Sequence, residues 1–223
     1  MKAHSKIVIV SPHPDDETLG AGGTLLRLRK EGNKIFWLNF TDMRKEYGYS
    51  ARDVLRRTLE IEKVIASYSF NGFCNLGLKP ACISEYPRKE LVEKVTKILK
   101  KIKPEMIILP FRNDVHSDHR AVFELVYSCT KSFRAKFIKK ILMMEVLSET
   151  EFSSSDNGFV PNFFVDISGY LARKIQIAKI FKSELKRHPF PRSFRNIKSL
   201  ATFRGGAAGC KYAESFMVLK EIW

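Results

Sequence analysis

Short apolar runs alternate with stretches of helical periodicity through the first two-thirds of the chain. An apolar run of four to eight residues bounded by turn residues is typical of a buried strand, whereas apolar residues three and four positions apart predict an amphipathic helix. The predicted strands in this part are Lys6–Ser11, Ile35–Phe40, Phe70–Leu76 and Glu105–Pro110, and the predicted helices are Thr18–Gly32, Ala51–Tyr68, Glu90–Ile102 and Asp118–Lys131.

The order strand, helix, strand, helix predicts an α/β fold in which a mostly parallel sheet is covered by helices on both faces. The later part of the chain is less regular. It predicts strands at Lys140–Val146 and Phe163–Ile167, a long basic helix at Tyr170–Lys186, and a C-terminal stretch that is helical but rich in loops. Because no repeat or low-complexity linker interrupts the sequence, residues 1–223 are expected to form a single domain.

The composition is that of an ordinary globular protein, with 223 residues of which 44% are hydrophobic and 28% charged. No apolar run approaches the roughly 20 residues of a membrane-spanning helix. The first apolar run, Ile7–Val10, leads at once into a polar loop without a signal-peptide cleavage site, so a cytoplasmic location is expected. Four scattered cysteines without a C-x-x-C pair predict free thiols.

A net charge of +15 is unusual for this length. Such an excess favours acidic partners, which include phosphorylated or nucleotide-linked sugars, anionic lipid surfaces and nucleic acid. A solvated lysine-rich face without any partner fits the charge equally well. The sequence therefore leaves open peripheral membrane contact, and it leaves open a homo-oligomer.

Two polar motifs directly follow predicted strands. Residues 13–17 read His-Pro-Asp-Asp-Glu after the first strand, and residues 116–119 read His-Ser-Asp-His after the fourth. The carboxyl ends of parallel strands lie at one edge of the sheet, where ligand sites form at the point of strand-order reversal. If the first and fourth strands are neighbours, the two motifs bring three histidines and at least three carboxylates together.

These residue types favour a metal-dependent hydrolase. Catalytic zinc takes three protein ligands from histidine and carboxylate groups and keeps a position for water. His13 and Asp16 can reach one ion from a single turn, a histidine of the second motif completes the set, and Asp15 accepts a proton from water. The remaining histidine stabilises charge on a carbonyl oxygen, with Asp118 orienting it and favouring its protonated form. The alternative, carboxylates that merely stabilise helix N-termini, does not explain both motifs at matching strand ends.

Glycines 20, 22 and 23 raise the alternative of a dinucleotide-binding module without catalysis. That fingerprint needs its glycines immediately after the strand, where this chain has the acidic turn at residues 13–16. The glycines fall inside the predicted first helix instead. They are better explained by close packing of that helix against the sheet or the metal loop.

With these motifs the chain resembles the LmbE-like (PIG-L) family of zinc-dependent N-acetylglucosamine deacetylases. The segment Arg57-Thr-Leu-Glu60 resembles the family's Arg-x-x-Glu element. A C-terminal pattern of many members is matched by His188–Ser193, Arg204-Gly205 and Tyr212–Phe216. The resemblance therefore spans nearly the whole chain. Ser117 stands where the family usually has proline, at a position without a metal ligand.

The resemblance implies a Rossmann-like sheet and a set of site residues. Zinc would be held by His13, Asp16 and His119, with Asp15 as general base, His116 paired with Asp118 as oxyanion stabiliser and acid, and Arg57 near the substrate. Zn²⁺ is the implied cofactor, and such a ligand set also accepts Fe²⁺ or Co²⁺.

The expected function is hydrolysis of the acetamide of an N-acetylated amino sugar, sugar nucleotide or glycolipid headgroup. The nearest alternative is the same machinery acting on another small amide, such as a thiol-sugar conjugate or a glycosylated natural product. A nucleic-acid-binding protein is the remote alternative, suggested only by charge. Because no basic stripe with interleaved aromatic residues stands out, no specific nucleic-acid partner is expected.

Overall fold

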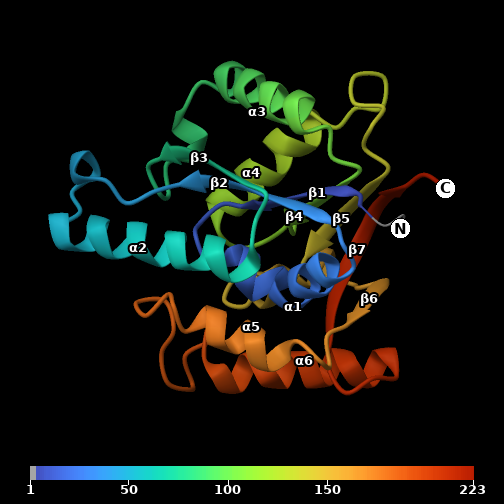
Figure 1. Cartoon of the computed structure of the whole chain (residues 1–223). Helices are drawn as coiled ribbons and strands as arrows, with labels where there is room; N and C mark the ends of the chain where they lie inside the picture. The colour runs from blue at the N-terminus through green and yellow to red at the C-terminus, as the bar shows by residue number, and fades with distance from the viewer. Residues whose placement is uncertain (1–3) are drawn as a thin grey trace.

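The buried apolar runs of the sequence form the strands of one seven-stranded sheet (Figure 1). The structure is a computed structural model and describes residues 4–223. The strands are β1 (Lys6–Ser11), β2 (Lys34–Thr41), β3 (Gly72–Leu78), β4 (Met106–Pro110), β5 (Lys140–Met144), β6 (Phe163–Asp166) and β7 (Ala213–Glu221). The α-helices are α1 (Asp16–Lys30), α2 (Ala51–Tyr68), α3 (Arg88–Ile102), α4 (Ser117–Ser128), α5 (Leu171–Ala178) and α6 (Phe194–Ala208). Four short 3₁₀ helices lie at Lys45–Tyr47, Ile83–Glu85, Thr150–Phe152 and Ser155–Asn157.

The strand order is β3-β2-β1-β4-β5-β7-β6, and β1 to β5 are parallel. The chain builds outward from β1 to β3 and then returns to place β4 on the other side of β1. The predicted neighbourhood of the first and fourth strands is thus confirmed. Strand order reverses at this point, so the carboxyl ends of β1 and β4 open a crevice for a ligand.

Helices cover both faces of the sheet, as predicted. α3 and α4 pack on one face around a buried cluster that includes Leu91, Val95 and Val126. On the other face α1 and α2 lie against the sheet, and α5 and α6 lie beneath α1 (Figure 1). The α/β fold class predicted from the sequence is confirmed.

The last third of the chain differs from the prediction in two ways. The predicted helix Tyr170–Lys186 is wrong in length, because α5 ends at Ala178. Beyond α5 the chain leaves the helix axis. In this segment Phe181 is buried, and Glu184 forms an ion pair with Arg57. Strand β7 was not predicted. It inserts antiparallel between β5 and β6 and so joins the C-terminal segment to the sheet.

The glycines of α1 do serve close packing, as predicted. A Cβ atom at Gly22 would lie 2.6 Å from the hydroxyl of Tyr68, and one at Gly23 would lie 2.7 Å from Ile167. Both distances are shorter than any ordinary carbon contact. The glycines therefore let α2 and the segment before α5 approach the helix that follows the first polar motif.

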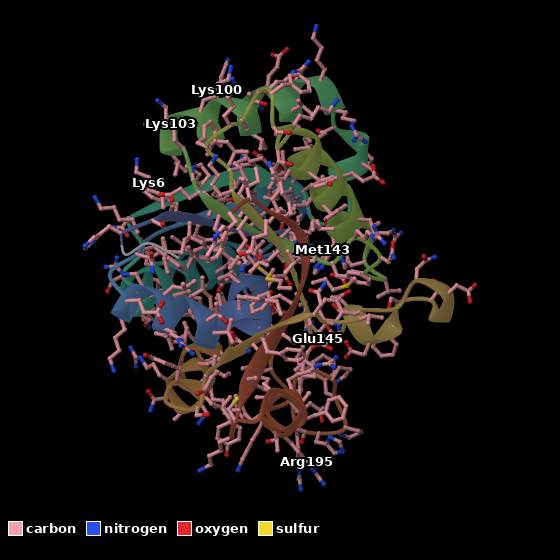
Figure 2. All side chains as sticks on the ribbon, turned by 90° about the vertical axis from the view of Figure 1, so that its right-hand side faces the viewer. Lys6, Lys100, Lys103, Met143, Glu145 and Arg195 are labelled. Atoms are coloured by element: carbon pink, nitrogen blue, oxygen red, sulfur yellow. The ribbon has the colours of Figure 1, made fainter. Side chains whose placement is uncertain are left out.

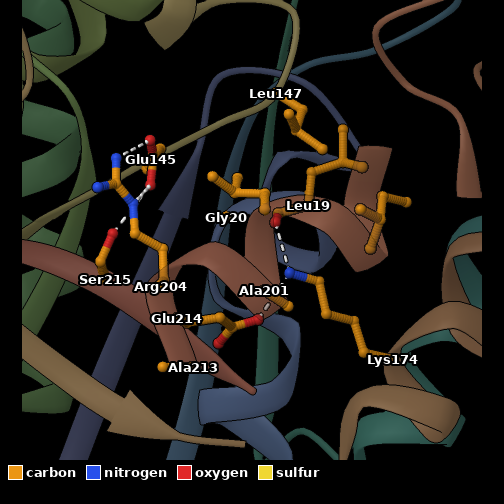
Figure 3. Close-up of a pocket in the computed structure, with 12 residues that line it drawn as sticks. Leu19, Gly20, Glu145, Leu147, Lys174, Ala201, Arg204, Ala213, Glu214 and Ser215 are labelled. Carbon is orange, nitrogen blue, oxygen red and sulfur yellow. Dashed lines mark hydrogen bonds and ion pairs between the residues drawn. The ribbon is translucent and has the colours of Figure 1, made fainter. Parts of the chain in front are cut away.

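A buried ion pair is inserted into the same stretch of α1 (Figure 3). The ammonium of Lys174 donates to the carbonyl of Leu19 (2.7 Å) and to the carboxylate of Glu214 (2.7 Å). Glu214 in turn accepts from the amides of Gly23 (2.8 Å) and Thr24 (2.7 Å). In a regular helix the amide of residue 23 would pair with the carbonyl of residue 19. The ion pair bridges these two groups and ties α5 and β7 to α1.

The basic residues are spread over the surface. Figure 2 shows Lys100 and Lys103 near one end of the molecule and Arg195 near the other. Helix by helix, residues 4–223 offer no segment long and apolar enough to traverse a bilayer. The four cysteines are free thiols and are buried or half-buried, as predicted.

Candidate active site

The two polar motifs meet at the carboxyl ends of β1 and β4 and line a cleft of about 240 Å³. His13, Pro14, Asp15 and Asp16 form one wall together with His116. The remaining lining residues come from the end of β2 and the loop after it, from α2, from the loop after β3, from the segment after β5 and from the loop before α6, and they include Asp42, Arg57, Glu149, Glu184 and Arg192. The cleft therefore draws on residues from across the sequence.

Three side chains in this cleft form a candidate metal site. The Oδ2 atom of Asp16 lies 3.6 Å from Nδ1 of His13 and 3.3 Å from Nε2 of His119, and the three ligand atoms lie within 4.8 Å of one another. Nε2 of His119 is buried without a hydrogen-bond partner. A buried polar atom without a partner is costly, and a metal ion would satisfy it. Two imidazole nitrogens and one carboxylate fit a divalent metal with positions left for water and substrate.

Each histidine of this set is oriented by a carboxylate on its other ring nitrogen. Asp118 contacts Nε2 of His13 (2.9 Å), and Asp114 contacts Nδ1 of His119 (2.7 Å). Asp118 also accepts from the amide of Ala81 (2.7 Å), while Asp114 accepts from the hydroxyl of Thr150 (2.6 Å). Such carboxylate partners fix the tautomer and direction of a metal-binding histidine.

The expected pairing of Asp118 with His116 is corrected by this geometry. The carboxylate of Asp118 bonds His13, whereas its backbone amide donates to Nδ1 of His116 (3.1 Å). Burial and the neighbouring rings of His13 and His119 lower the pKa of His116 to about 4. The ring is therefore neutral near pH 7, with its proton on Nε2, and it is a hydrogen-bond donor rather than the protonated group expected from the sequence.

Asp15 stands beside the metal ligands in an unusual backbone conformation, with φ 140° and ψ −26°. Such a conformation costs a residue other than glycine on the order of 1–3 kcal/mol and persists where the surrounding structure enforces it. Its Oδ2 atom is buried and has no hydrogen-bond partner. Burial and the charge of Asp16 raise the pKa of Asp15 well above its usual value. A carboxylate with a raised pKa is a stronger base near neutral pH.

Comparison with known proteins connects this geometry to a family. The sequence pattern of the GlcNAc-PI de-N-acetylase (PIG-L) family matches residues 8–130, which is more than half of the chain. The chain belongs to this family. All three candidate metal ligands of this PIG-L protein, and Asp15 between them, lie within the matched segment.

Similar proteins extend the likeness beyond that segment. The chain is 25% identical over 230 residues to a diacetylchitobiose deacetylase of Thermococcus kodakarensis, covering 98% of this chain and 84% of the relative. The structure of N,N'-diacetylchitobiose deacetylase from Pyrococcus horikoshii matches 97% of this chain and 84% of its own, with a TM-score of 0.77 and 21% identity. The conserved protein TT1542 from Thermus thermophilus matches with a TM-score of 0.79 and 23% identity, over 98% of this chain and 96% of its own. The two structures support the fold.

Arg57 of this PIG-L protein lies at the cleft but is occupied by protein partners. Its side chain is almost fully buried, donates to the carbonyl of Pro14 (2.9 Å), and forms ion pairs with Glu184 and Glu60. The implied contact with substrate therefore stays a prediction, and a supporting role for the loop before Asp15 has direct geometric support.

Asp114 and Arg192 are site residues that the sequence reasoning did not assign. Asp114 could have been found, since it is an acidic residue in the same loop as the second motif. Arg192 lies in an irregular loop and places a guanidinium nitrogen 3.5 Å from Oδ2 of Asp15 and another 3.5 Å from Glu184. The family pattern matched at residues 188–193 includes Arg192, but it does not predict that this residue would meet Asp15, 177 positions away.

Metal affinity is expected to rise with pH. Burial lowers the pKa of His13, but hydrogen bonds to Asp118 and Asp16 outweigh it and raise the pKa to about 9 in the metal-free protein. A histidine must be neutral to bind a metal, so below pH 9 the ion displaces a proton from His13, and metal affinity falls about tenfold per pH unit for each proton displaced.

Calorimetric titration with Zn²⁺ in buffers of different ionisation enthalpy measures this proton release. Asp118→Asn, which removes a charge that raises the pKa of His13, should release fewer protons. Equal affinity at pH 6 and pH 8 would contradict the assignment of His13.

Proposed function

We propose that this chain is a metal-dependent N-deacetylase that hydrolyses the acetamide of an N-acetylated amino sugar. The observation that carries the proposal is the buried carboxylate oxygen of Asp15, which has no hydrogen-bond partner and belongs to the same motif as the candidate ligands His13 and Asp16. Membership of the PIG-L family and the likeness to a diacetylchitobiose deacetylase support both the reaction class and the saccharide substrate. Zn²⁺ is the proposed metal, since imidazole and carboxylate ligands in this number are typical of catalytic zinc.

The residues of the cleft can perform amide hydrolysis in a simple order. A bound divalent metal would lower the pKa of water and polarise the acetamide carbonyl. Asp15 takes a proton from the attacking water as its oxygen adds to the carbonyl carbon. The Nε2–H group of His116 donates a hydrogen bond to the oxygen that gains negative charge. When the C–N bond breaks, the proton held by Asp15 passes to the nitrogen, and acetate and a free amine leave.

The charges in the cleft favour an uncharged saccharide over a phosphorylated or nucleotide-linked one. Although the chain is strongly basic, Arg57 is paired with Glu60 and Glu184, and Arg192 lies between Glu184 and Asp15. Asp42 and Glu149 add further carboxylates to the lining. No cation among the described residues of the cleft lining is left without an acidic neighbour to bind a phosphate group.

The test is a free-amine assay on the metal-loaded protein with N-acetylglucosamine compounds. We expect amine release from N-acetylglucosamine and its short oligosaccharides, and a kcat/KM at least about tenfold lower for N-acetylglucosamine 1-phosphate, which corresponds to about 1.4 kcal/mol. Faster turnover of the phosphorylated compound would overturn the substrate charge assignment. Turnover of other small amides alone would keep the hydrolase and change its substrate. No amine release from any amide by protein that holds one metal ion per chain would contradict the proposed function. A cytoplasmic location, a homo-oligomer and membrane contact stay predictions.

A further inference from the structure

Glu17 is a buried carboxyl group that neither the metal site nor the proposed chemistry uses. Its side chain is fully buried in the first turn of α1. One carboxyl oxygen accepts from the backbone amide of Asp15 (3.1 Å), and the other accepts from the hydroxyl of Thr18 (2.6 Å). A carboxyl group is costly to bury unless its partners need it there, so these two contacts indicate what it does.

The hydrogen bond between Glu17 and the amide of Asp15 affects the direction in which the side chain of Asp15 points. The carbonyl of Asp15 is fixed on its C-terminal side, because it accepts from the amides of Thr18 (3.0 Å) and Leu19 (2.9 Å) at the start of the helix. Its amide is fixed on the N-terminal side by Glu17. With both flanking peptide planes held, φ and ψ of Asp15 have little freedom, and the bond from Cα to Cβ points in one direction. This accounts for a φ of 140° at a residue other than glycine.

The side chain of Asp15 does little to hold itself in place. Oδ2 makes no hydrogen bond, and its nearest charged partner, Arg192, lies at 3.5 Å. The direction of the Asp15 side chain is therefore set by the backbone of Asp15. The amide contact with Glu17 is similar to a capping box, in which an acidic side chain of the first turn accepts from the N-cap amide. Here the N-cap residue is the base itself, so this contact acts directly on the backbone that carries Asp15.

Glu17 is itself held by a second layer of contacts. The hydroxyl of Tyr68, from α2, donates to the hydroxyl of Thr18 (3.1 Å), which donates to Glu17. Tyr68 is buried, and Gly22 leaves the space that its hydroxyl occupies. The carboxyl group of Glu17 is thus fixed to two helices before it meets the amide of Asp15.

We infer that Glu17 is a positioning residue: its carboxyl group holds the backbone of Asp15 in the left-handed region and thereby aims the base at the attacking water. The kinetic part of this inference rests on the proposed deacetylase function. The structural part, the conformation of Asp15, does not.

The test compares three variants of the full-length, metal-loaded protein. Glu17→Met keeps the volume and removes the acceptor. Glu17→Gln keeps an oxygen that can accept from the amide of Asp15. Tyr68→Phe removes a hydroxyl of the same network without touching Asp15.

We expect Glu17→Met to bind one metal per chain with a KM near that of the wild type and a kcat about 10- to 100-fold lower, since a misplacement of about 1 Å can cost that much. Glu17→Gln should recover kcat to within a few-fold. Tyr68→Phe should lower the thermal midpoint but reduce kcat much less than Glu17→Met does, because the hydroxyl of Tyr68 reaches Glu17 only through Thr18.

Crystal structures of the same proteins separate this inference from the proposed function. Asp15 should keep its positive φ in the wild type, in Glu17→Gln and in Tyr68→Phe, and should leave it in Glu17→Met, whatever substrate the enzyme takes. A positive φ and an unchanged kcat in Glu17→Met would overturn the inference, as would losses of kcat that follow the loss of stability equally in Glu17→Met and Tyr68→Phe. If Glu17→Met does not fold, Glu17→Ala offers the same comparison without the bulk. A wild type that releases no amine contradicts the proposed function alone.

Discussion

Replacing Asp15 by asparagine is expected to abolish nearly all turnover while the metal stays bound. The variant keeps the shape of the side chain and its place beside His13, Asp16 and His119, but an amide cannot take a proton from water. General-base catalysis typically contributes about 100- to 10,000-fold to the rate, so kcat should fall by that factor. Because the substrate is held by other groups of the cleft, KM should change little. Metal content and steady-state kinetics on the same preparation measure both effects.

Asp42→Asn is the matched control for this prediction. Asp42 lines the same cleft and loses a carboxylate on the same substitution, but it follows β2 and belongs to neither candidate metal cluster. Its carboxylate accepts from the amide of Met43 and from the side-chain amide of Asn75, and asparagine keeps an acceptor for the first contact while losing the second. A loss of kcat as large in Asp42→Asn as in Asp15→Asn would mean that the charge of the cleft, and not a base at Asp15, supports turnover. An active Asp15→Asn would remove the base assignment altogether.

Removing His119 is expected to empty the metal site. His119 is fully buried, and its Nε2 atom makes no hydrogen bond and faces the Oδ2 atom of Asp16, so its removal takes one of the three ligands from the site. His119→Gln, which retains much of the volume, should lose the metal and with it all measurable amine release. Metal analysis after dialysis measures the loss directly. Adding Zn²⁺ should raise the thermal midpoint of the wild type and not that of the variant, because a ligand that binds only the folded state stabilises it by mass action.

Two further variants test which residues hold the metal, because they should lower metal affinity to different extents. Asp114→Asn leaves the ligand but weakens the contact that orients it, which typically costs about 10- to 100-fold in metal affinity. His116→Ala should keep full metal content and lose rate only, because His116 lies outside the ligand set of His13, Asp16 and His119. An affinity order in which His116→Ala lies below Asp114→Asn would point to the alternative cluster of His13, His116 and Asp118 as the metal site.

The sequence predicted which side chains meet in the cleft better than it predicted how they pair. His13, Asp16 and His119 follow the carboxyl ends of two strands, and strand ends can be recognised from runs such as Ile7–Val10 without knowledge of the packing. Asp118 was assigned to the wrong histidine because the choice between His13 and His116 depends on side-chain directions. Sequence spacing does not contain these, and His13 lies 105 positions away.

The part of the fold that could not be predicted is the part held by distant polar contacts. Helix α5 was predicted too long because Tyr170–Lys186 has continuous helical character. The ion pair between Arg57 and Glu184 lies beyond the end of α5 and joins distant parts of the chain, so the local pattern does not contain it. Strand β7 was missed although residues 216–219 are apolar, since the C-terminal stretch was predicted to be helical and rich in loops; in the structure this strand contains the buried Glu214. That glutamate is explained only by Lys174 and the amides of α1.

The ion pair inside α1 also bears on the order in which the protein matures. Glu214 lies 191 positions after Gly23 and 190 after Thr24, so two amides of the helix that follows the metal-binding loop are bonded by a strand that is synthesised about 190 residues later. Contacts of such long sequence separation form late, because the chain between them must first be closed into a loop. On the ribosome, the N-terminal part that contains every candidate ligand would therefore emerge well before it can adopt its final geometry. Metal capture is then expected only after β7 has been synthesised and its Glu214 has bonded to the amides of α1.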